Sequence, residues 1–290
     1  MKILVTSMWF DGFGGSEAWC YAVISELLRR GHSVDVYAPV LGKMYKELEN
    51  LGVKCVTQGC YDLILDNHSP QYTSFTGPII HTCHGIIDRL DRPMANAFNV
   101  AVSKKIGEHY NVTTIIPNGI DTNRFCCKKP VHSEITKVLS LCKTDTANSV
   151  LRQICSDVGV EFESMYGKEV FHVEDKINEA DLVVGVGRSL LDAMACERPV
   201  VSFDDRFYFT TRMMGHGYIT PDKYKYQAID NFTASSLRKT LHKVDVAKEI
   251  FEKYNPDDGK LHRKYILDNL SVEQTVNRYI ELYNTIYVRK

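Results

Sequence analysis

The sequence has no excess of charge of either sign, which limits the partners that bulk electrostatics could attract. Its 35 Lys and Arg residues are offset by 36 Asp and Glu residues, so the formal net charge is -1. Neither the part before Asp121 nor the part after it is a polycation. Since nonspecific binding to nucleic acid or to an anionic membrane depends on a surplus of basic residues, the composition argues against both.

The chain also lacks long apolar runs and paired cysteines. No stretch approaches the ~20 apolar residues that a transmembrane helix needs. The nine cysteines are odd in number and form no Cys-x-x-Cys pair, which favours buried, reduced thiols. The first residues are unlike a signal peptide, because a strand-like run soon meets Asp11 and a glycine loop. We therefore expect a cytoplasmic protein with no integral membrane segment.

The sequence also lacks the composition of a disordered chain and any short internal repeat. Of the 290 residues, 44% are hydrophobic and 24% are charged, which is close to the average for globular domains. No repeat is visible at the short periods of solenoid proteins. At roughly 100–200 residues per domain, the length predicts one large domain or two modest ones.

What the sequence does contain is a regular alternation of short apolar runs with helical patterns. The strands expected from it lie at residues 2–6, 33–37, 54–56, 63–65, 78–81, 100–102, 113–116, 137–141, 170–173, 182–185 and 199–203, and the helices at 16–30, 43–51, 147–158, 189–196 and 272–287. Such an alternation predicts an α/β protein with parallel sheets covered by helices on both faces.

A turn divides this alternation into two halves. Pro117, Asn118 and Gly119 follow one another, and a glycine there could adopt a positive φ. The alternation of strands and helices restarts after the turn. This favours two Rossmann-like domains over one continuous sheet, with a ligand in the cleft between them.

Two glycine loops follow expected strands and open expected helices. Gly14-Gly15-Ser16-Glu17 would let backbone N–H groups approach an anion at a helix N-terminus. In Gly185-Val186-Gly187-Arg188-Ser189, Arg188 adds a cation suited to a pyrophosphate. Taken alone, the first loop is better explained as a plain helix start. For the second loop, a tight turn with a solvated arginine explains the residues equally well.

Three groups of residues, spanning most of the chain, resemble motifs of one known family. They are Gly14–Glu17 followed by residues 30–36, residues 116–121 with Phe125 shortly after, and residues 180–184 followed by residues 191–201. In this order they are similar to the Gly-Gly-x-Glu loop, the interdomain Pro-Asn-Gly segment and the donor-site block of GT-B glycosyltransferases of the retaining family-4 type.

The resemblance implies a GT-B fold, in which two Rossmann-like domains face each other across a cleft. Residues 1–120 would form the acceptor-side domain and residues 121–271 the nucleotide-sugar-binding domain. The helix within residues 272–290 would pack back on the first domain.

The resemblance also implies roles for individual residues. The donor phosphates would be bound by Gly14, Gly15, Lys143, Gly187, Arg188 and Ser189. Asp192 takes the place of the second glutamate of the family's E-x7-E motif and would bind the nucleotide ribose. His84 matches a histidine near the transferred sugar, where it could donate a hydrogen bond. A histidine at a strand end is as well explained by a structural role.

Two positions depart from the family pattern. Val184 stands where the first glutamate of E-x7-E is expected, and it cannot hydrogen-bond a donor sugar. In the family's Arg-x4-Lys pair, Lys143 stands in the arginine place and Asn148 in the lysine place, so one phosphate-neutralising cation is missing. We expect Arg188 to compensate for this loss.

No metal or cofactor is expected beyond the nucleotide sugar itself, because GT-B enzymes generally neutralise the leaving diphosphate with basic side chains and helix N-termini. Asp204-Asp205 is interpreted as a loop, and Cys126-Cys127 lacks zinc-ligand spacing with His132. The implied reaction is transfer of a hexosyl or pentosyl group with retention, by attack of the acceptor hydroxyl on the face that the diphosphate leaves. The acceptor would be a small molecule, a saccharide or a lipid-linked glycan.

Two alternatives stay open. One is a glycosyltransferase that modifies hydroxylated bases in DNA, for which the candidate contacts are Lys104-Lys105, Lys128-Lys129 and Arg263-Lys264. The near-zero net charge disfavours it. The other is a degenerate, non-catalytic GT-B protein that binds a nucleotide or a partner, which the losses at Val184 and Asn148 would explain.

Overall fold

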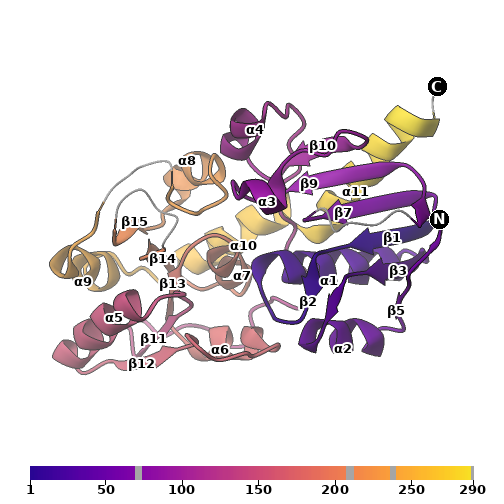
Figure 1. Cartoon of the computed structure of the whole chain (residues 1–290). Coiled ribbons are helices and arrows are strands. Elements are labelled where there is room, and N and C mark those ends of the chain that lie inside the picture. The colour runs from indigo at the N-terminus through magenta and orange to yellow at the C-terminus, as the bar shows by residue number, and fades with distance from the viewer. Residues whose placement is uncertain (69–73, 207–211, 236–239, 289–290) are drawn as a thin grey trace. The chain divides into compact units, whose positions relative to one another are not determined.

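The computed structural model describes residues 1–68, 74–206, 212–235 and 240–288 (Figure 1). The chain forms two compact units. The first contains Met1–Asp121 and Leu270–Lys290, and the second contains Thr122–Asn269. Each unit is built around a mainly parallel sheet with helices, so the prediction of an α/β protein with two Rossmann-like domains is confirmed.

The first unit has a six-stranded sheet in the order β10-β9-β7-β1-β3-β5, in which every pair of neighbours is parallel. Its strands are β1 (Lys2–Thr6), β3 (Ser33–Tyr37), β5 (Lys54–Cys55), β7 (Leu63–Asn67), β9 (Ile79–Cys83) and β10 (Phe98–Ala101). Two small parallel pairs are formed by β2 (Trp9–Phe10) with β4 (Val40–Leu41), and by β6 (Gly59–Cys60) with β8 (Phe75–Thr76).

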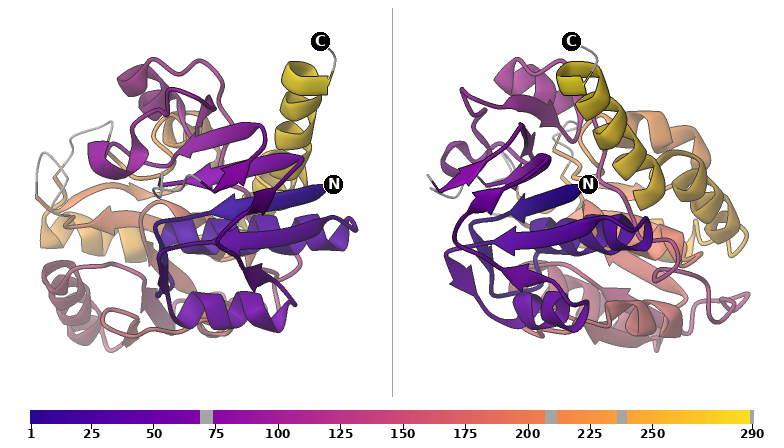
Figure 2. Two further views of the ribbon diagram at one scale, coloured as in Figure 1. Left: turned by 45° about the vertical axis from the view of Figure 1, so that its right-hand side comes forward. Right: turned by 90° about the vertical axis from the view of Figure 1, so that its right-hand side faces the viewer.

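The helices of this unit pack by their apolar faces. They are α1 (Gly15–Arg29), α2 (Lys43–Asn50), α3 (Asp88–Asp91), α4 (Lys104–Tyr110) and α11 (Val272–Tyr283), and α11 ends in a π-helical turn, η2 (Asn284–Val288). The C-terminal helix lies beside the N-terminal sheet (Figure 2). There the rings of Trp19 on α1 and Tyr279 on α11 meet edge to face at 5.9 Å, and the Tyr279 hydroxyl lies 2.8 Å from Oγ1 of Thr82.

Residues 117–121, expected as a turn, form no turn in the structure, and Ile120 instead makes a parallel bridge with Ser271 at the start of α11. The N–H of Ile120 donates to Leu270 O, and the N–H of Val272 donates back to Ile120 O, both at 2.9 Å. A Cβ on Gly119 would lie 2.7 Å from the Cα of Val272 and from Oγ1 of Thr275. Gly119 does not have the positive φ that the sequence suggested. A glycine is required there because the helix approaches the backbone closely.

The second unit has a five-stranded sheet in the order β12-β11-β13-β14-β15, with only β15 antiparallel to its neighbour. Its strands are β11 (Lys137–Ser140), β12 (Glu161–Ser164), β13 (Leu182–Gly185), β14 (Val200–Asp204) and β15 (Met214–Tyr218). Its helices are α5 (Asp145–Val158), α6 (Val173–Glu179), α7 (Arg188–Ala195), η1 (Pro221–Lys223), α8 (Tyr224–Ala228), α9 (Lys243–Phe251) and α10 (Asp258–Asn269).

Two of the expected strands are wrong. Residues 170–172 are irregular and Val173 begins α6, while residues 113–116 form only an isolated bridge between Ile115 and Ala101. The structure instead has β12 and β15 at the two edges of the second sheet. No helix in the described part of the chain is long and apolar enough to cross a membrane.

Candidate functional site

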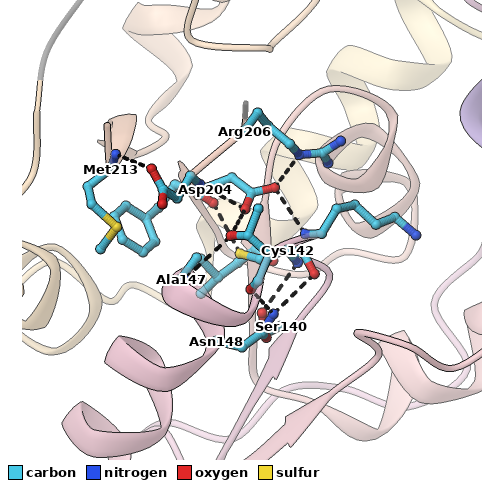
Figure 3. Close-up of polar contacts among 12 residues, drawn as sticks. Ser140, Cys142, Ala147, Asn148, Asp204, Arg206 and Met213 are labelled. Carbon is cyan, nitrogen blue, oxygen red and sulfur yellow. Dashed lines mark hydrogen bonds and ion pairs between the residues drawn. The ribbon is translucent and has the colours of Figure 1, made fainter. Parts of the chain in front are cut away.

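The carboxyl end of the second sheet is organised by one buried carboxylate, Asp204, the last residue of β14 (Figure 3). Asp204 is fully buried. Its Oδ2 accepts a hydrogen bond from the backbone N–H of Lys143 at 3.1 Å, and its Oδ1 accepts one from the Thr144 hydroxyl at 3.1 Å. The backbone N–H of Asp205 and the Nε–H of Arg206 donate to the same carboxylate. Asp204 therefore ties the loop after β11 to the loop after β14.

The Lys143 side chain is exposed at this edge of the sheet. Its pKa is lowered below the ordinary value, first because the surrounding protein atoms remove part of its hydration and then because the Arg206 guanidinium repels its charge. The Asp204 carboxylate opposes this shift. Lys143 therefore lies in a locally positive field, despite the balanced charge of the whole chain.

Asn148, in the place where the resemblance expects a lysine, has a structural role. It lies on α5 and is 1% exposed. Its Nδ2 donates to the carbonyls of Cys142 (3.2 Å) and Thr144 (2.7 Å), while its Oδ1 accepts from the Ser164 hydroxyl at 2.7 Å. These bonds hold the same loop that Asp204 holds, so Asn148 shapes the loop and supplies no positive charge.

The second glycine loop opens α7 after β13. Gly187 has φ 62°, which favours glycine, and its N–H donates to Phe232 O at 2.7 Å. That amide is therefore engaged by the protein itself. Arg188 and Ser189 are the first two residues of α7, and neither is fully buried. Arg188 and Ser189 were expected to bind the donor phosphates. They lie at the N-terminus of α7, where a bound anion would be stabilised.

Arg188 and Asp192 lie one turn apart on α7. The Nε of Arg188 is 3.5 Å from Oδ1 of Asp192, and their side chains are only 9% and 11% exposed. Burial raises the pKa of Asp192, against the effect of the Arg188 and Arg124 guanidinium groups. Asp192, predicted to bind the ribose, and Arg188, predicted to bind phosphate, therefore lie together. The protein only partly stabilises the negative charge of Asp192.

Val184, in the first-glutamate place, is a fully buried residue of β13 whose carbonyl accepts from the N–H of Leu141 at 2.8 Å. Asp205 is paired with the Arg212 guanidinium and accepts from the N–H of Met213 at 2.9 Å. Across the described ranges, no group of three or more His, Cys, Asp or Glu residues is placed to hold a metal ion.

In the first unit, the two glycines of the N-terminal loop differ. A Cβ on Gly14 would overlap with the Glu17 carboxylate, whereas a Cβ on Gly15 would meet no described atom within 4 Å. Gly14 is therefore needed for packing, while Gly15 leaves the first turn of α1 open. Glu17 is 4% exposed and accepts a hydrogen bond from the Ser16 hydroxyl at 3.0 Å. Burial raises its pKa.

His84 follows β9 directly. Its backbone N–H donates to Oδ1 of the buried Asp91 at 3.1 Å, and its ring lies edge to face with Trp19 at 5.0 Å. The ring of His68, just past the end of β7, is 6.1 Å away. His68 has φ 59° and is 6% exposed, and its Nδ1 has no hydrogen-bond partner among the described residues. Burial lowers its pKa.

Sequence reasoning missed His68 and Arg206 at these two sheet edges, and it named Glu17 only as part of the glycine loop. For His68, a usable signal was the polar pair Asn67-His68 directly after a buried strand. For Arg206, it was a cation directly after the buried strand that ends in Asp204. The carboxyl ends of parallel strands are where α/β proteins bind ligands.

The basic pairs considered for DNA binding are largely engaged by acidic partners. The ion pairs are Lys104 with Glu108 (3.7 Å), Lys128 with Asp175 (2.7 Å) and Lys264 with Asp268 (2.6 Å). Arg263 donates to the backbone carbonyl of Phe125 at 3.0 Å. These contacts offset the charge that contacts to DNA phosphates would need, which weakens that alternative.

No protein-family model and no curated protein matches the sequence. Solved structures do match along the whole chain. A glycosyltransferase from Rickettsia africae ESF-5 superposes with a TM-score of 0.60 at 13% identity, covering 99% of both chains. Anabaena HepE, in complex with UDP and glucose, superposes with a TM-score of 0.58 at 15% identity, covering 99% of this chain and 100% of the other.

The protein has a GT-B fold. A putative UDP-N-acetylglucosamine 2-epimerase from Listeria monocytogenes has a similar structure, with a TM-score of 0.57 at 13% identity over 100% of this chain and 98% of the other. The same GT-B fold therefore occurs in proteins described as transferases and as an epimerase, and the activity has to be argued from the residues.

Proposed function

We propose that the protein is a glycosyltransferase that moves a sugar from a nucleotide-diphosphate sugar to an acceptor hydroxyl. The observation that carries the proposal is the edge of the Thr122–Asn269 sheet. There Lys143 and the α7 residues Arg188, Ser189 and Asp192 follow the parallel strands β11 and β13. The likeness of the fold to glycosyltransferase structures supports the same conclusion.

Each of these residues has a chemical role in the proposal. Lys143 and Arg188 neutralise the diphosphate, and the Ser189 hydroxyl and the N-terminus of α7 donate hydrogen bonds to it. Asp192 accepts hydrogen bonds from the ribose hydroxyls, which compensates its carboxylate for burial. Because these cations and the helix N-terminus supply the positive charge, the proposal includes no metal or further cofactor.

The reaction proposed is transfer with retention. The bond between the anomeric carbon and the diphosphate oxygen breaks as the acceptor oxygen bonds to that carbon on the same face, and the acceptor proton passes to the departing diphosphate. Preorganised donors stabilise the charge that develops on the leaving group. His84 donates a hydrogen bond to the sugar or the acceptor. The acceptor is a small molecule, a saccharide or a lipid-linked glycan.

A screen of donors tests the proposal. Thermal shifts are measured with UDP-, GDP-, ADP- and dTDP-sugars, and the products formed with acceptor panels are identified by mass spectrometry. Transfer releases a nucleoside diphosphate and adds a sugar mass to an acceptor. An isomerised donor of unchanged mass would favour an epimerase, and binding without turnover would favour a non-catalytic nucleotide-binding protein.

The role of Arg188 has its own test. We expect Arg188→Ala to weaken nucleotide-sugar binding by about tenfold or more, because a charge-assisted hydrogen bond contributes about 1.5–3 kcal/mol. The control is Lys176→Ala, which removes a half-exposed lysine that is paired with Glu179 at 3.0 Å. Isothermal titration calorimetry measures both variants. Equal losses in the two variants would contradict the role of Arg188.

A further inference from the structure

Arg206 and Lys143 meet at the same buried carboxylate, from opposite loops of the second sheet. The Nε–H of Arg206 and the backbone N–H of Lys143 both donate to Oδ2 of Asp204 (Figure 3). Asp204 is fully buried, so it orients the two residues from beneath while the Lys143 side chain stays exposed. The Arg206 side chain is 18% exposed.

The charge of Arg206 acts on Lys143. Arg206 lowers the pKa of Lys143 more than the Asp204 carboxylate raises it. Arg206 is near enough for its charge to affect Lys143, and an anion bound beside both residues would relieve this repulsion. The N-terminus of α5, a 14-residue helix that starts at Asp145, begins two residues after Lys143 and adds to the same field.

The ion pair on α7 is arranged differently. Arg188 lies within 3.5 Å of Asp192, and both residues belong to one helix. Arg206 instead pairs with Asp204, whose fully buried carboxylate also accepts the backbone N–H of Lys143. Arg206 therefore adds a cation, on the loop after β14, to those that Lys143 and Arg188 supply.

We propose that Arg206 is a further cation of the donor diphosphate site, acting with Lys143 on the phosphate groups. This inference rests on the proposed function, since it assigns the ligand of the same site. Asp204 positions both cations and does not contact the ligand. The loop geometry that Asn148 maintains puts Lys143 within reach of the same anion.

Two substitutions at Arg206 separate its charge from its hydrogen bond to Asp204. Arg206→Gln keeps an N–H donor where Nε was and removes the charge. Arg206→Lys keeps the charge and loses the planar guanidinium. The matched control is Arg152→Ala, which removes a guanidinium from the exposed face of α5, where it lies over Phe162 at 5.7 Å. Thermal melting of each variant first verifies that it is folded.

Calorimetry then measures the affinity of each folded variant for UDP, GDP, ADP and dTDP and for the parent nucleosides. For the diphosphate that binds the wild type best, we expect Arg206→Gln to weaken binding about 10- to 100-fold. Arg206→Lys should weaken it less, and Arg152→Ala should leave it within about twofold. Affinity for the nucleoside should not change, because Arg206 contacts phosphate only.

The outcomes distinguish the inference from the function on which it rests. If the wild type binds none of the four diphosphates, the proposed function fails. If the wild type binds one of them and Arg206→Gln binds it equally well, Arg206 only supports Asp204 and the inference is overturned. An equal loss for nucleoside and diphosphate would also overturn it, since that result would indicate a distorted loop.

Discussion

At the scale of single residues, the two sheet edges carry ionisable groups whose burial works against their charge. Glu17, at the start of α1, is 4% exposed, and Asp192, on α7, is 8% exposed. Burial raises the pKa of both carboxyl groups. A buried carboxyl group with a raised pKa does not help the protein to fold at neutral pH. Such groups are typical of binding and catalytic sites.

Glu17 gives a prediction about stability and pH. Because its pKa is higher in the folded than in the unfolded chain, its contribution to stability is present at low pH and is lost as the pH rises through the folded value. Glu17→Gln should therefore match the wild type near pH 4 and melt about 2–4 °C higher at pH 8. Melting curves across this range measure the effect.

The control for this prediction is Glu108→Gln, since Glu108 is an exposed residue of α4 in the same unit and pairs with Lys104. Its melting temperature relative to wild type should vary little with pH. A Glu17→Gln variant that is less stable than wild type at pH 8 would mean that the hydrogen bond from Ser16 outweighs the cost of burying the charge.

At the scale of elements, the end of α7 contains a residue poorly suited to its backbone. Glu197 follows the C-cap Cys196 and has φ 60°, a left-handed conformation that favours glycine. Its carbonyl lies against Gly259, which fixes the path of the chain there. The side chain makes a long ion pair, 3.9 Å to Nε of Arg263, and a hydrogen bond with the Cys127 thiol.

Glu197→Gly should therefore stabilise the protein by about 0.5–1 kcal/mol relative to Glu197→Ala, because both variants lose the contacts of the carboxylate and only glycine relieves the strained φ. Glu197→Ala is the matched control, since it removes the same carboxylate but keeps the Cβ. It should be no more stable than wild type. Chemical denaturation of the three proteins tests the difference, and equal stability of the Gly and Ala variants would refute the role of the backbone.

The strands that the sequence predicted most readily are those buried along nearly their whole length. β1, β13 and β14 consist mainly of apolar residues, as expected where helices cover both faces of a parallel sheet. The edge strands β12 and β15 of the second sheet were missed. The first is Glu-Phe-Glu-Ser, with a single apolar residue, and the second contains two glycines, so neither has a strand-like pattern.

The residues of the candidate site also divide into those that the sequence could identify and those that it could not. Lys143, Arg188 and Asp192 stand in motifs that resemble a known family, so their positions could be named from the sequence. Arg206 could not, because its place beside Lys143 depends on the pairing of three strands and on the buried Asp204. The same holds for His68 and His84, which are brought together by neighbouring strands.

At the scale of the whole molecule, the chain completes its first unit last. It leaves that unit after Asp121, forms Thr122–Asn269, and returns at Leu270. The return is held by Tyr279, which is 1% exposed, bonds to Thr82 and packs on Trp19. The core of residues 1–121 therefore depends on a helix more than 150 residues away in the sequence, whereas the second unit is one continuous segment.

Tyr279→Ala should consequently destabilise the first unit alone, by about 3–5 kcal/mol, the usual cost of removing a buried aromatic ring. Hydrogen exchange followed by mass spectrometry would locate the effect, with faster exchange in residues 1–121 and 270–288 and little change in residues 122–269. Tyr218→Ala, which removes a fully buried ring from β15, is the reciprocal variant and should give the opposite pattern. Because the proposed nucleotide site lies within the second unit, Tyr279→Ala should also retain nucleoside diphosphate binding under conditions where Tyr218→Ala loses it. Loss of protection throughout the chain in both variants would instead mean that the two units unfold as one.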